Sequence, residues 1–268
     1  MELGLKGRRC VVTGASRGIG RAVAETLAGE GADVLLVGRG TEALREAAAA
    51  VAEAAAPGAR AETFAADVTA AEAGEAIVAA CVERLGGIDV LVNNAGTSSV
   101  VPLERLEEAD WEQQWQLNVR GPERLMRAAA PRMADGGWGR IVNVTSSSGK
   151  RPSATNVAYA VTKTAQLALS RAYAEAWAPR GVLVNAVAPG PTASELWMGE
   201  GGLADQAAAV RGVDREQVLE AASARVPLGR YSTPGEIADA IAYLCSERAA
   251  NVVGAAWSVD GGAVPYFI

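Results

Sequence analysis

Short apolar runs alternate with longer amphipathic segments along this chain, and the two patterns predict strands and helices. The apolar runs predict buried strands at residues 9–13, 33–39, 61–65, 88–92, 140–145, 182–187 and 256–259. Between them, apolar residues recur at helical spacing, and helices are predicted after Gly20 and at 41–56, 70–85, 110–133 and 233–245. This alternation predicts one α/β domain over residues 1–268, with a Rossmann-type doubly wound, mainly parallel seven-stranded sheet and helices on both faces.

Composition narrows the classes of function. The chain has 25 basic and 31 acidic residues and no basic cluster, which disfavours nucleic-acid binding. No apolar run approaches the roughly 18 residues of a membrane span, and the N-terminus lacks the pattern of a signal peptide, so we expect a cytoplasmic protein. Cys10, Cys81 and Cys245 are far apart in apolar segments, which predicts buried thiols and neither a metal site nor disulfides.

The first predicted strand turns into a helix through a glycine-rich segment, Gly14 to Gly20. Such a turn lets backbone N–H groups approach a diphosphate, and the helix dipole favours its negative charge. The glycine spacing, with three residues and then one between glycines, differs from the commoner GxGxxG pattern. An ordinary tight connection between strand and helix is the alternative.

Two arginines bear on which dinucleotide would bind. An NAD-binding unit usually has an acid near the end of its second strand, where this chain has Gly38 and Arg39. Arg39 and Arg17 can instead bind a 2′-phosphate, so NADP(H) is favoured over NAD(H); two solvated surface arginines are the alternative. At the end of the third strand, Asp67 suits either an adenine amino group or a helix cap.

Acid–base chemistry must use unusual groups because the chain has no histidine. Tyr159 and Lys163 are four residues apart, which places them on one face of a helix. A neighbouring cation stabilises phenolate and lowers the pKa of a tyrosine from about 10. An exposed helix pair without a catalytic role is the alternative for these two residues alone.

Taken in order, the motifs resemble those of the short-chain dehydrogenase/reductase family. The glycine turn is followed by Asn93-Asn94-Ala95-Gly96, Asn118, Ser146, Tyr159-x-x-x-Lys163 and Pro189-Gly190, then by Pro234-Gly-Glu-Ile-Ala and Val259-Asp260-Gly261-Gly262. The resemblance covers nearly the whole chain. Each motif is weak to moderately specific, but their ordered combination is highly specific.

The resemblance implies a catalytic role for four residues. Tyr159 would exchange a proton with the carbonyl oxygen, Ser146 would hydrogen-bond that oxygen, and Lys163 would lower the phenol pKa and hold the nicotinamide ribose. Asn118 would interrupt its helix and hold a water beside Lys163. Among three consecutive serines, the family's usual separation from Tyr159 selects Ser146. The residues assigned to the cofactor are Gly14, Ser16, Arg17, Gly18, Ile19, Gly20, Arg39, Asp67, Val68, Asn94, Ala95, Gly96, Tyr159, Lys163, Pro189, Gly190 and Thr192.

The long connection over residues 191–232 is predicted to be a substrate lid with one or two short helices, because connections of this length are usually functional. Trp197 and Met198 would form an apolar wall of the substrate site, although packing against another subunit is a close alternative. Lys150, Arg151 and Asn156 are further candidates for substrate contacts. The two cations would suit an anionic acyl carrier or coenzyme A, or are simply surface charges.

The predicted function is therefore reversible hydride transfer between NADP(H) and a small-molecule carbonyl or secondary alcohol, with a 3-oxoacyl thioester as the leading specific substrate. An NAD-dependent alcohol dehydrogenase of the same family is one alternative. A non-catalytic dinucleotide-binding redox sensor or scaffold is another, although Asn118, Ser146, Tyr159 and Lys163 are all present. By analogy with the family, we expect a homotetramer.

Overall fold

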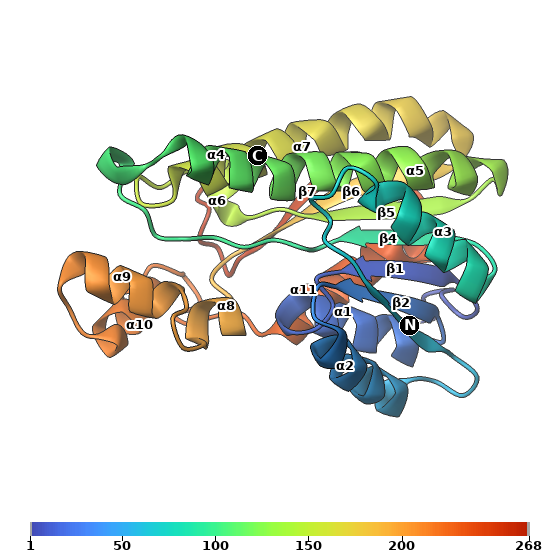
Figure 1. The fold of residues 1–268 in the computed structure, drawn as a ribbon, viewed down its shortest axis with the longest axis horizontal. Coiled ribbons are helices and arrows are strands. Elements are labelled where there is room, and N and C mark those ends of the chain that lie inside the picture. Colours follow the sequence, from blue (N-terminus) through green and yellow to red (C-terminus); the bar gives the residue numbers. More distant parts are fainter. Residues whose placement is uncertain (1, 267–268) are drawn as a thin grey trace.

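A seven-stranded sheet forms the centre of the computed structural model, which describes residues 2–266 (Figure 1). All neighbouring strands are parallel, in the order β3-β2-β1-β4-β5-β6-β7, so the sheet is wholly and not only mainly parallel. The strands are β1 (Arg9–Thr13), β2 (Asp33–Gly38), β3 (Ala61–Ala65), β4 (Val90–Asn93), β5 (Gly139–Val144), β6 (Val182–Pro189) and β7 (Ala256–Val259).

The strand order reverses between β1 and β4, which lie side by side. In an open parallel sheet, the connections on the two sides of such a point leave in opposite directions and open a crevice at the carboxyl ends of the strands. Ligands bind there in doubly wound folds. The fold therefore directs attention to the residues that follow β1, β4, β5 and β6.

Helices cover both faces of the sheet (Figure 1). One face carries α1 (Gly18–Gly29), α2 (Thr41–Ala54) and α11 (Pro234–Cys245), and their buried side chains form one apolar core with β1 and β2. The other face carries α3 (Ala73–Leu85), α4 (Glu108–Trp115), α5 (Gly121–Asp135) and α7 (Val157–Trp177) over a second core. The predicted doubly wound architecture is confirmed.

The helix predicted over 110–133 is interrupted at Asn118, as the resemblance implied. A single π-helical turn, Gln116–Arg120, separates α4 from α5 and contains Asn118. A π-turn carries one extra residue per turn and redirects the side chains within it. The other predicted elements agree with the structure to within a few residues at their ends, except that α3 begins at Ala73, after a turn that follows Asp67.

The connection after β6 holds three helices, where one or two were predicted. They are α8 (Glu195–Met198), α9 (Leu203–Arg211) and α10 (Arg215–Ser223), and they project from one end of the molecule (Figure 1). Arg215 ties this segment together, because its Nη1 atom donates to Asp205 Oδ1 at 2.9 Å and its other terminal nitrogen donates to the Met198 carbonyl. The backbone N–H of Val100 donates to Gln206 Oε1 at 3.0 Å and connects α9 to the segment after β4.

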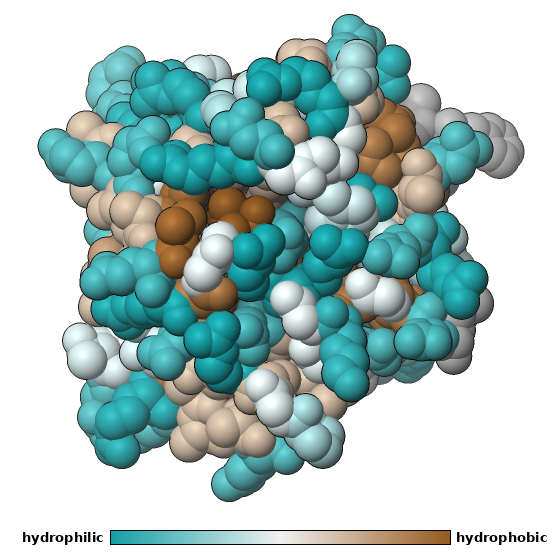
Figure 2. Space-filling model, turned by 90° about the vertical axis from the view of Figure 1, so that its right-hand side faces the viewer, coloured by the Kyte–Doolittle hydropathy of each residue, from teal (hydrophilic) through white to brown (hydrophobic). Residues whose placement is uncertain are grey.

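The surface seen in Figure 2 is mainly hydrophilic, with small separate apolar clusters. Among the helices of residues 2–266, none combines the length and the apolar character needed to cross a bilayer. Cys10, Cys81 and Cys245 are free and buried, as predicted. The short helix α6 (Ser147–Lys150) completes the set of α-helices in the described chain and begins at the serine run.

Candidate active site

Four predicted catalytic residues are brought into one region by three elements. Ser146 follows β5 and caps α6, where its Oγ accepts a hydrogen bond from the backbone N–H of Ser148 at 3.1 Å. Tyr159 and Lys163 lie on successive turns of α7, and Asn118 lies in the π-turn packed against α7. Ser147 and Ser148 belong to α6 itself, whereas Ser146 hydrogen-bonds the Tyr159 phenol.

The Lys163 ammonium is almost fully enclosed, with 3% of the residue exposed. Its Nζ donates to the Val144 carbonyl at 2.9 Å and to Gln166 Oε1 at 3.0 Å, and lies 5.7 Å from the centroid of the Tyr159 ring. Because burial penalises the charged form, the pKa of Lys163 falls to about 7.

The Tyr159 phenol behaves differently from the prediction. Burial raises its pKa above the usual value, and the hydrogen bond with Ser146 acts in the opposite direction but does not outweigh burial. The expected lowering of this pKa by Lys163 is therefore not seen in the chain alone. Lys163 lies beside the ring and directs its hydrogen bonds to Val144 and Gln166.

Asn118 is oriented by two buried partners. Its Nδ2 donates to Gln114 Oε1 at 2.7 Å and to Thr162 Oγ1 at 3.2 Å, whereas its Oδ1 is buried and accepts no hydrogen bond from the described residues. A Cβ added to Gly96 would lie 3.5 Å from Asn118 Oδ1 and 3.6 Å from Lys163 Nζ. Glycine at this position keeps space beside both atoms, and a donor such as water would satisfy the buried oxygen.

The glycine turn after β1 has the geometry of an anion site. Gly14 and Gly18 have φ of +65° and +56°, which favours glycine. A Cβ on Gly20 would lie 2.3 Å from the Gly14 carbonyl and 2.4 Å from Asn94 Nδ2, so no larger residue fits. Residue Arg17, at the N-cap of α1, makes no side-chain cap, and the first turn holds no acid. The N-terminal N–H groups of α1 therefore suit a diphosphate.

Asn94 links this turn to the end of β4. Its Nδ2 donates to the carbonyls of Thr13 at 2.9 Å and Gly14 at 3.2 Å, and Thr13 Oγ1 accepts from the backbone N–H groups of Asn94 and Ala95 at 3.0 Å each. The two strands at the reversal point are thus fixed to each other. This explains why the Asn-Asn-Ala-Gly motif accompanies the glycine turn.

Arg17 and Arg39 are exposed at the carboxyl ends of β1 and β2, and neither forms an ion pair with a carboxylate within residues 2–266. Asp67 is a turn cap: its Oδ1 accepts from Thr69 N at 2.9 Å and from Thr69 Oγ1 at 2.8 Å. These bonds, with a smaller contribution from Arg39, lower the pKa of Asp67. Val68, next to it, is buried in the second core.

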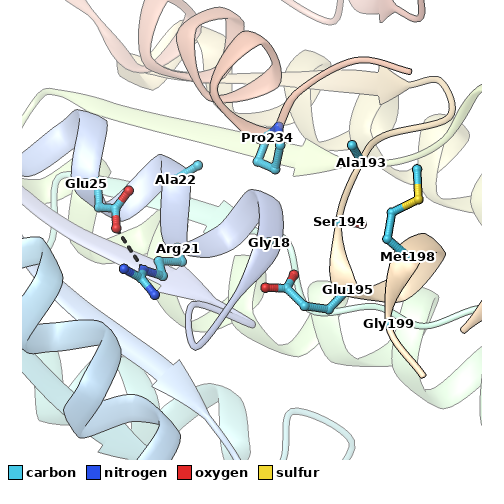
Figure 3. Close-up of a pocket in the computed structure, with 10 residues that line it drawn as sticks. All are labelled: Gly18, Arg21, Ala22, Glu25, Ala193, Ser194, Glu195, Met198, Gly199 and Pro234. Carbon is cyan, nitrogen blue, oxygen red and sulfur yellow. Dashed lines mark hydrogen bonds and ion pairs between the residues drawn. The ribbon is translucent and has the colours of Figure 1, made fainter. Parts of the chain in front are cut away.

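The segment after β6 lies across from the glycine turn. A groove of about 490 Å³ is lined by Gly18 on one side and by Ser194, Glu195 and Met198 on the other (Figure 3). The Glu195 carboxylate points toward Gly18, and Arg21 pairs with Glu25 along the α1 wall at 2.8 Å. Thr192 is buried, and its Oγ1 donates to the Gly190 carbonyl at 3.0 Å. A Cβ on Gly190 would meet Asp260 at 2.8 Å, which explains the glycine after Pro189.

The predicted substrate residues separate into two groups. Asn156 lines a small cavity together with Tyr159, Ser99 and Gln114, and its Oδ1 is buried without a partner in the described chain. Trp197 contacts Tyr231 edge-on, with ring centroids 5.6 Å apart, and Met198 lines the groove beside Gly18.

Lys150 and Arg151 are directed elsewhere. Lys150 Nζ donates to the Ala256 carbonyl at 2.6 Å and to Ser258 Oγ at 3.0 Å, and Arg151 donates to the Ala263 carbonyl at 3.3 Å. Both cations thus bind β7 and the segment after it. Arg151 stays exposed in this position, and the acyl-carrier interpretation of the two charges stays a prediction.

Two buried glutamines were missed by the sequence analysis. Gln166 is three residues after Lys163 and Gln114 is four residues before Asn118, so each contacts a catalytic candidate from an adjacent helical turn. A polar residue on an otherwise apolar helix face is the signal that could have identified them.

The comparisons with known proteins identify the family of the chain. The family model for short chain dehydrogenases matches residues 8–201. The chain belongs to the short-chain dehydrogenase/reductase family. It is 32% identical over 262 residues to the 3-oxoacyl-[acyl-carrier-protein] reductase FabG of Aquifex aeolicus, covering 98% of this chain and 99% of that protein.

Two solved members of the family have the same fold over almost their whole length. The L-sorbose reductase of Gluconobacter frateurii, complexed with NADPH and L-sorbose, superposes with a TM-score of 0.92 at 34% identity, covering 100% of each chain. A variant of the actinorhodin polyketide ketoreductase with NADPH superposes with a TM-score of 0.90 at 34% identity, covering 97% of this chain and 98% of the other. The chain is therefore an oxidoreductase of this family.

Proposed function

We propose that the protein catalyses reversible hydride transfer between NADP(H) and a carbonyl or secondary alcohol. The observation that carries the proposal is the grouping of Ser146, Tyr159, Lys163 and Asn118 at the carboxyl ends of the strands, next to a glycine turn shaped for a diphosphate. This grouping combines a cofactor cradle with acid–base residues in one crevice.

In the direction of reduction, NADPH would supply the hydride when bound. The Tyr159 phenol gives its proton to the carbonyl oxygen, and its raised pKa keeps it protonated at neutral pH. Ser146 hydrogen-bonds the phenol and would hydrogen-bond the same substrate oxygen. The Lys163 ammonium supports the charge that develops on the phenol oxygen, and Asn118 Oδ1 accepts from a water that returns a proton toward Lys163.

NADP(H) is proposed over NAD(H) because Arg17 and Arg39 have no carboxylate partner in the described chain and lie where a ribose 2′-phosphate would be bound. NADPH in the complexes of the two solved relatives is consistent with this proposal. An acid that could accept a hydrogen bond from a free 2′-hydroxyl is missing from the end of β2, where the chain has Gly38.

The substrate is proposed as a carbonyl compound that enters beneath the segment 191–232, which we propose as the lid. Trp197, Tyr231 and Asn156 offer an aromatic pair and a buried amide oxygen. The relatives include a 3-oxoacyl thioester reductase and an L-sorbose reductase, so acyl thioesters and ketoses are both within the class. Lys150 and Arg151 bind β7 and its following segment, so the proposal for the substrate class rests on the relatives and not on these two charges.

The test is a screen of NADPH oxidation with 3-oxoacyl thioesters, ketoses, steroids and small ketones, together with titrations of NADPH and NADH followed by nicotinamide fluorescence. The proposal requires turnover of at least one carbonyl class and tighter binding of NADPH. Tight NADPH binding without turnover of any carbonyl would instead support a dinucleotide sensor. Equal or tighter NADH binding would support the NAD-dependent alternative.

We further propose that the protein forms a homotetramer, as members of this family commonly do. Trp115 on α4 and Val161 on α7 are large apolar side chains with 42% and 43% of their surface exposed, which suits an interface across these helices. Light scattering after size exclusion measures the mass. A monomer at micromolar concentration would contradict the proposal.

A further inference from the structure

The Lys163 ammonium has three N–H groups, and the structure accounts for two of them. One donates to the Val144 carbonyl at the end of β5 and one to Gln166 Oε1. The space kept open by Gly96 lies beside the same nitrogen and beside Asn118 Oδ1. The two acceptors therefore fix the ammonium with its third N–H free for the catalytic crevice.

Gln166 is itself firmly held. It has 1% of its surface exposed, and its backbone carbonyl accepts from Ser170 Oγ at 2.7 Å. Ser170 in turn accepts from Asn143 Nδ2 at 2.8 Å, which ties α7 to the middle of β5. These bonds hold the backbone of α7 at Gln166 against β5, and the contact of the Gln166 side chain itself is the one that its Oε1 makes with Lys163 Nζ.

The other charged groups packed around α7 form ion pairs or hydrogen bonds with residues other than Lys163. Tyr159 is the titratable neighbour on α7 itself. On α5, Glu123 pairs with Arg120 at 3.3 Å and Arg127 at 3.6 Å; on α4, Asp110 accepts from the backbone of Glu107 at 3.0 Å.

On α6, Lys150 is directed to β7. No carboxylate in residues 2–266 forms an ion pair with Lys163. Gln166 Oε1 is thus the side-chain acceptor that this ammonium has.

We infer that Gln166 is a positioning residue that stabilises the ammonium form of Lys163 and directs it at the catalytic crevice. The inference rests on the proposed function for its catalytic meaning, but the hydrogen bond itself belongs to the chain without cofactor. An amide oxygen stabilises the ammonium without adding a charge that would oppose phenolate at Tyr159, which a carboxylate at the same position would do.

Removing this acceptor should shift Lys163 toward its neutral form. A hydrogen bond to a buried charged group is strong, and losing it leaves an N–H unpaired at a site where the charge is already disfavoured. In Gln166→Met, which keeps the volume but has no acceptor, the proton affinity of Lys163 is expected to fall about ten-fold or more. In Gln166→Glu, an ionised carboxylate should raise it by a similar factor.

The chain offers a direct measurement, because Lys6, Lys150 and Lys163 are its only lysines. With lysine labelled by ¹³C at the ε-carbon, an NMR pH titration of the cofactor-free protein shows three signals. Lys6→Arg and Lys150→Arg variants assign them. In the wild type the pKa of Lys163 is lowered to about 7. The control is Ser170→Ala, which removes the bond to the Gln166 backbone but leaves Lys163 untouched.

The expected result is a downward shift of the Lys163 titration in Gln166→Met, an upward shift in Gln166→Glu and none in Ser170→Ala. If Gln166→Met fails to fold, Gln166→Glu still tests the contact. An unchanged Lys163 titration in a folded Gln166 variant would overturn the inference.

A kinetic measurement tests whether the contact between Gln166 and Lys163 contributes to catalysis. With NADP⁺ and an alcohol, kcat/KM requires phenolate at Tyr159 beside charged Lys163. Gln166→Met should lower the high-pH plateau of kcat/KM about ten-fold and move its acid limb to lower pH. The pair loses its first proton mainly from Lys163, so a lower Lys163 pKa moves that loss to lower pH and reduces the fraction with phenolate beside ammonium. A lower plateau with an unmoved limb would indicate a merely structural role. If no alcohol or carbonyl is turned over but the NMR shifts appear, the proposed function fails while the Gln166–Lys163 contact stands.

Discussion

Replacing Arg39 by leucine should weaken the binding of NADPH and leave the binding of NADH almost unchanged. Arg39 is exposed at the end of β2, has no carboxylate partner in the described residues, and lies near enough to Asp67 to help lower the pKa of that carboxyl. Because Arg39 is exposed and forms no ion pair within residues 2–266, its loss should change the free energy of unfolding by less than about 0.5 kcal/mol.

The effect on cofactor binding should be much larger. A charge-assisted hydrogen bond to a phosphate contributes about 1.5–3 kcal/mol, and solvent exposure favours the lower figure. The Kd of NADPH should therefore rise about ten-fold near 0.15 M salt and more at low salt, whereas the Kd of NADH stays within about two-fold. Nicotinamide fluorescence titrations measure both. If both constants change by the same factor, Arg39 does not bind the 2′-phosphate, and the NADP(H) assignment loses half its basis.

Three further predictions address the cofactor turn and the buried lysine. Gly38→Asp places an acid at the end of β2, with its Cβ 3.3 Å from Leu44 Cδ2. In the same fluorescence titrations it should strengthen NADH binding and weaken NADPH binding by about ten-fold or more. Gly20→Ala should abolish dinucleotide binding and cost about 1–3 kcal/mol in denaturant unfolding, because its Cβ meets the Gly14 carbonyl; normal NADPH affinity would refute the close packing. The pKa of Lys163 is lowered to about 7 in the folded chain, against about 10.4 in the unfolded chain. Above pH 7 the unfolded chain therefore binds more protons than the folded chain. The free energy of unfolding should rise by roughly 1 kcal/mol between pH 7 and 8. Lys163→Met should remove that rise, and an identical pH dependence in both proteins would show that Lys163 is not buried as described.

The sheet was predictable because each strand is an apolar run that parallel sheets bury on both faces. The run Val-Leu-Val in 90–92 and the run Val-Leu-Val-Asn-Ala-Val in 182–187 are two examples, and both are buried strands. The tight turn from β1 to α1 was also predictable from its glycines, because glycine favours the positive φ of Gly18 and only glycine fits the close contact of Gly20 with Asn94.

The features that depend on the direction of a side chain could not be predicted in the same way. Lys150 lies beside the serine run in sequence, yet its long side chain reaches β7, which is more than a hundred residues away along the chain. The π-turn at Asn118 was implied by the resemblance alone, since one extra residue within a helix barely alters the apolar pattern and periodicity gave no sign of it. The burial of Lys163, which lowers the pKa of its ammonium, depends on how α7 packs against β5.

The central claim is that Tyr159 carries the proton in an NADP(H)-dependent carbonyl reduction. Its most direct test is the rate of NADPH oxidation by the wild-type protein and by Tyr159→Phe, with the best carbonyl substrate found in the screen. Phenylalanine keeps the ring beside Lys163 and removes only the hydroxyl that bonds Ser146, so NADPH affinity should stay within about two-fold. General acid–base catalysis contributes roughly a hundred- to ten-thousand-fold, and kcat should fall by that factor. A Tyr159→Phe protein that retains a near wild-type rate would contradict the account.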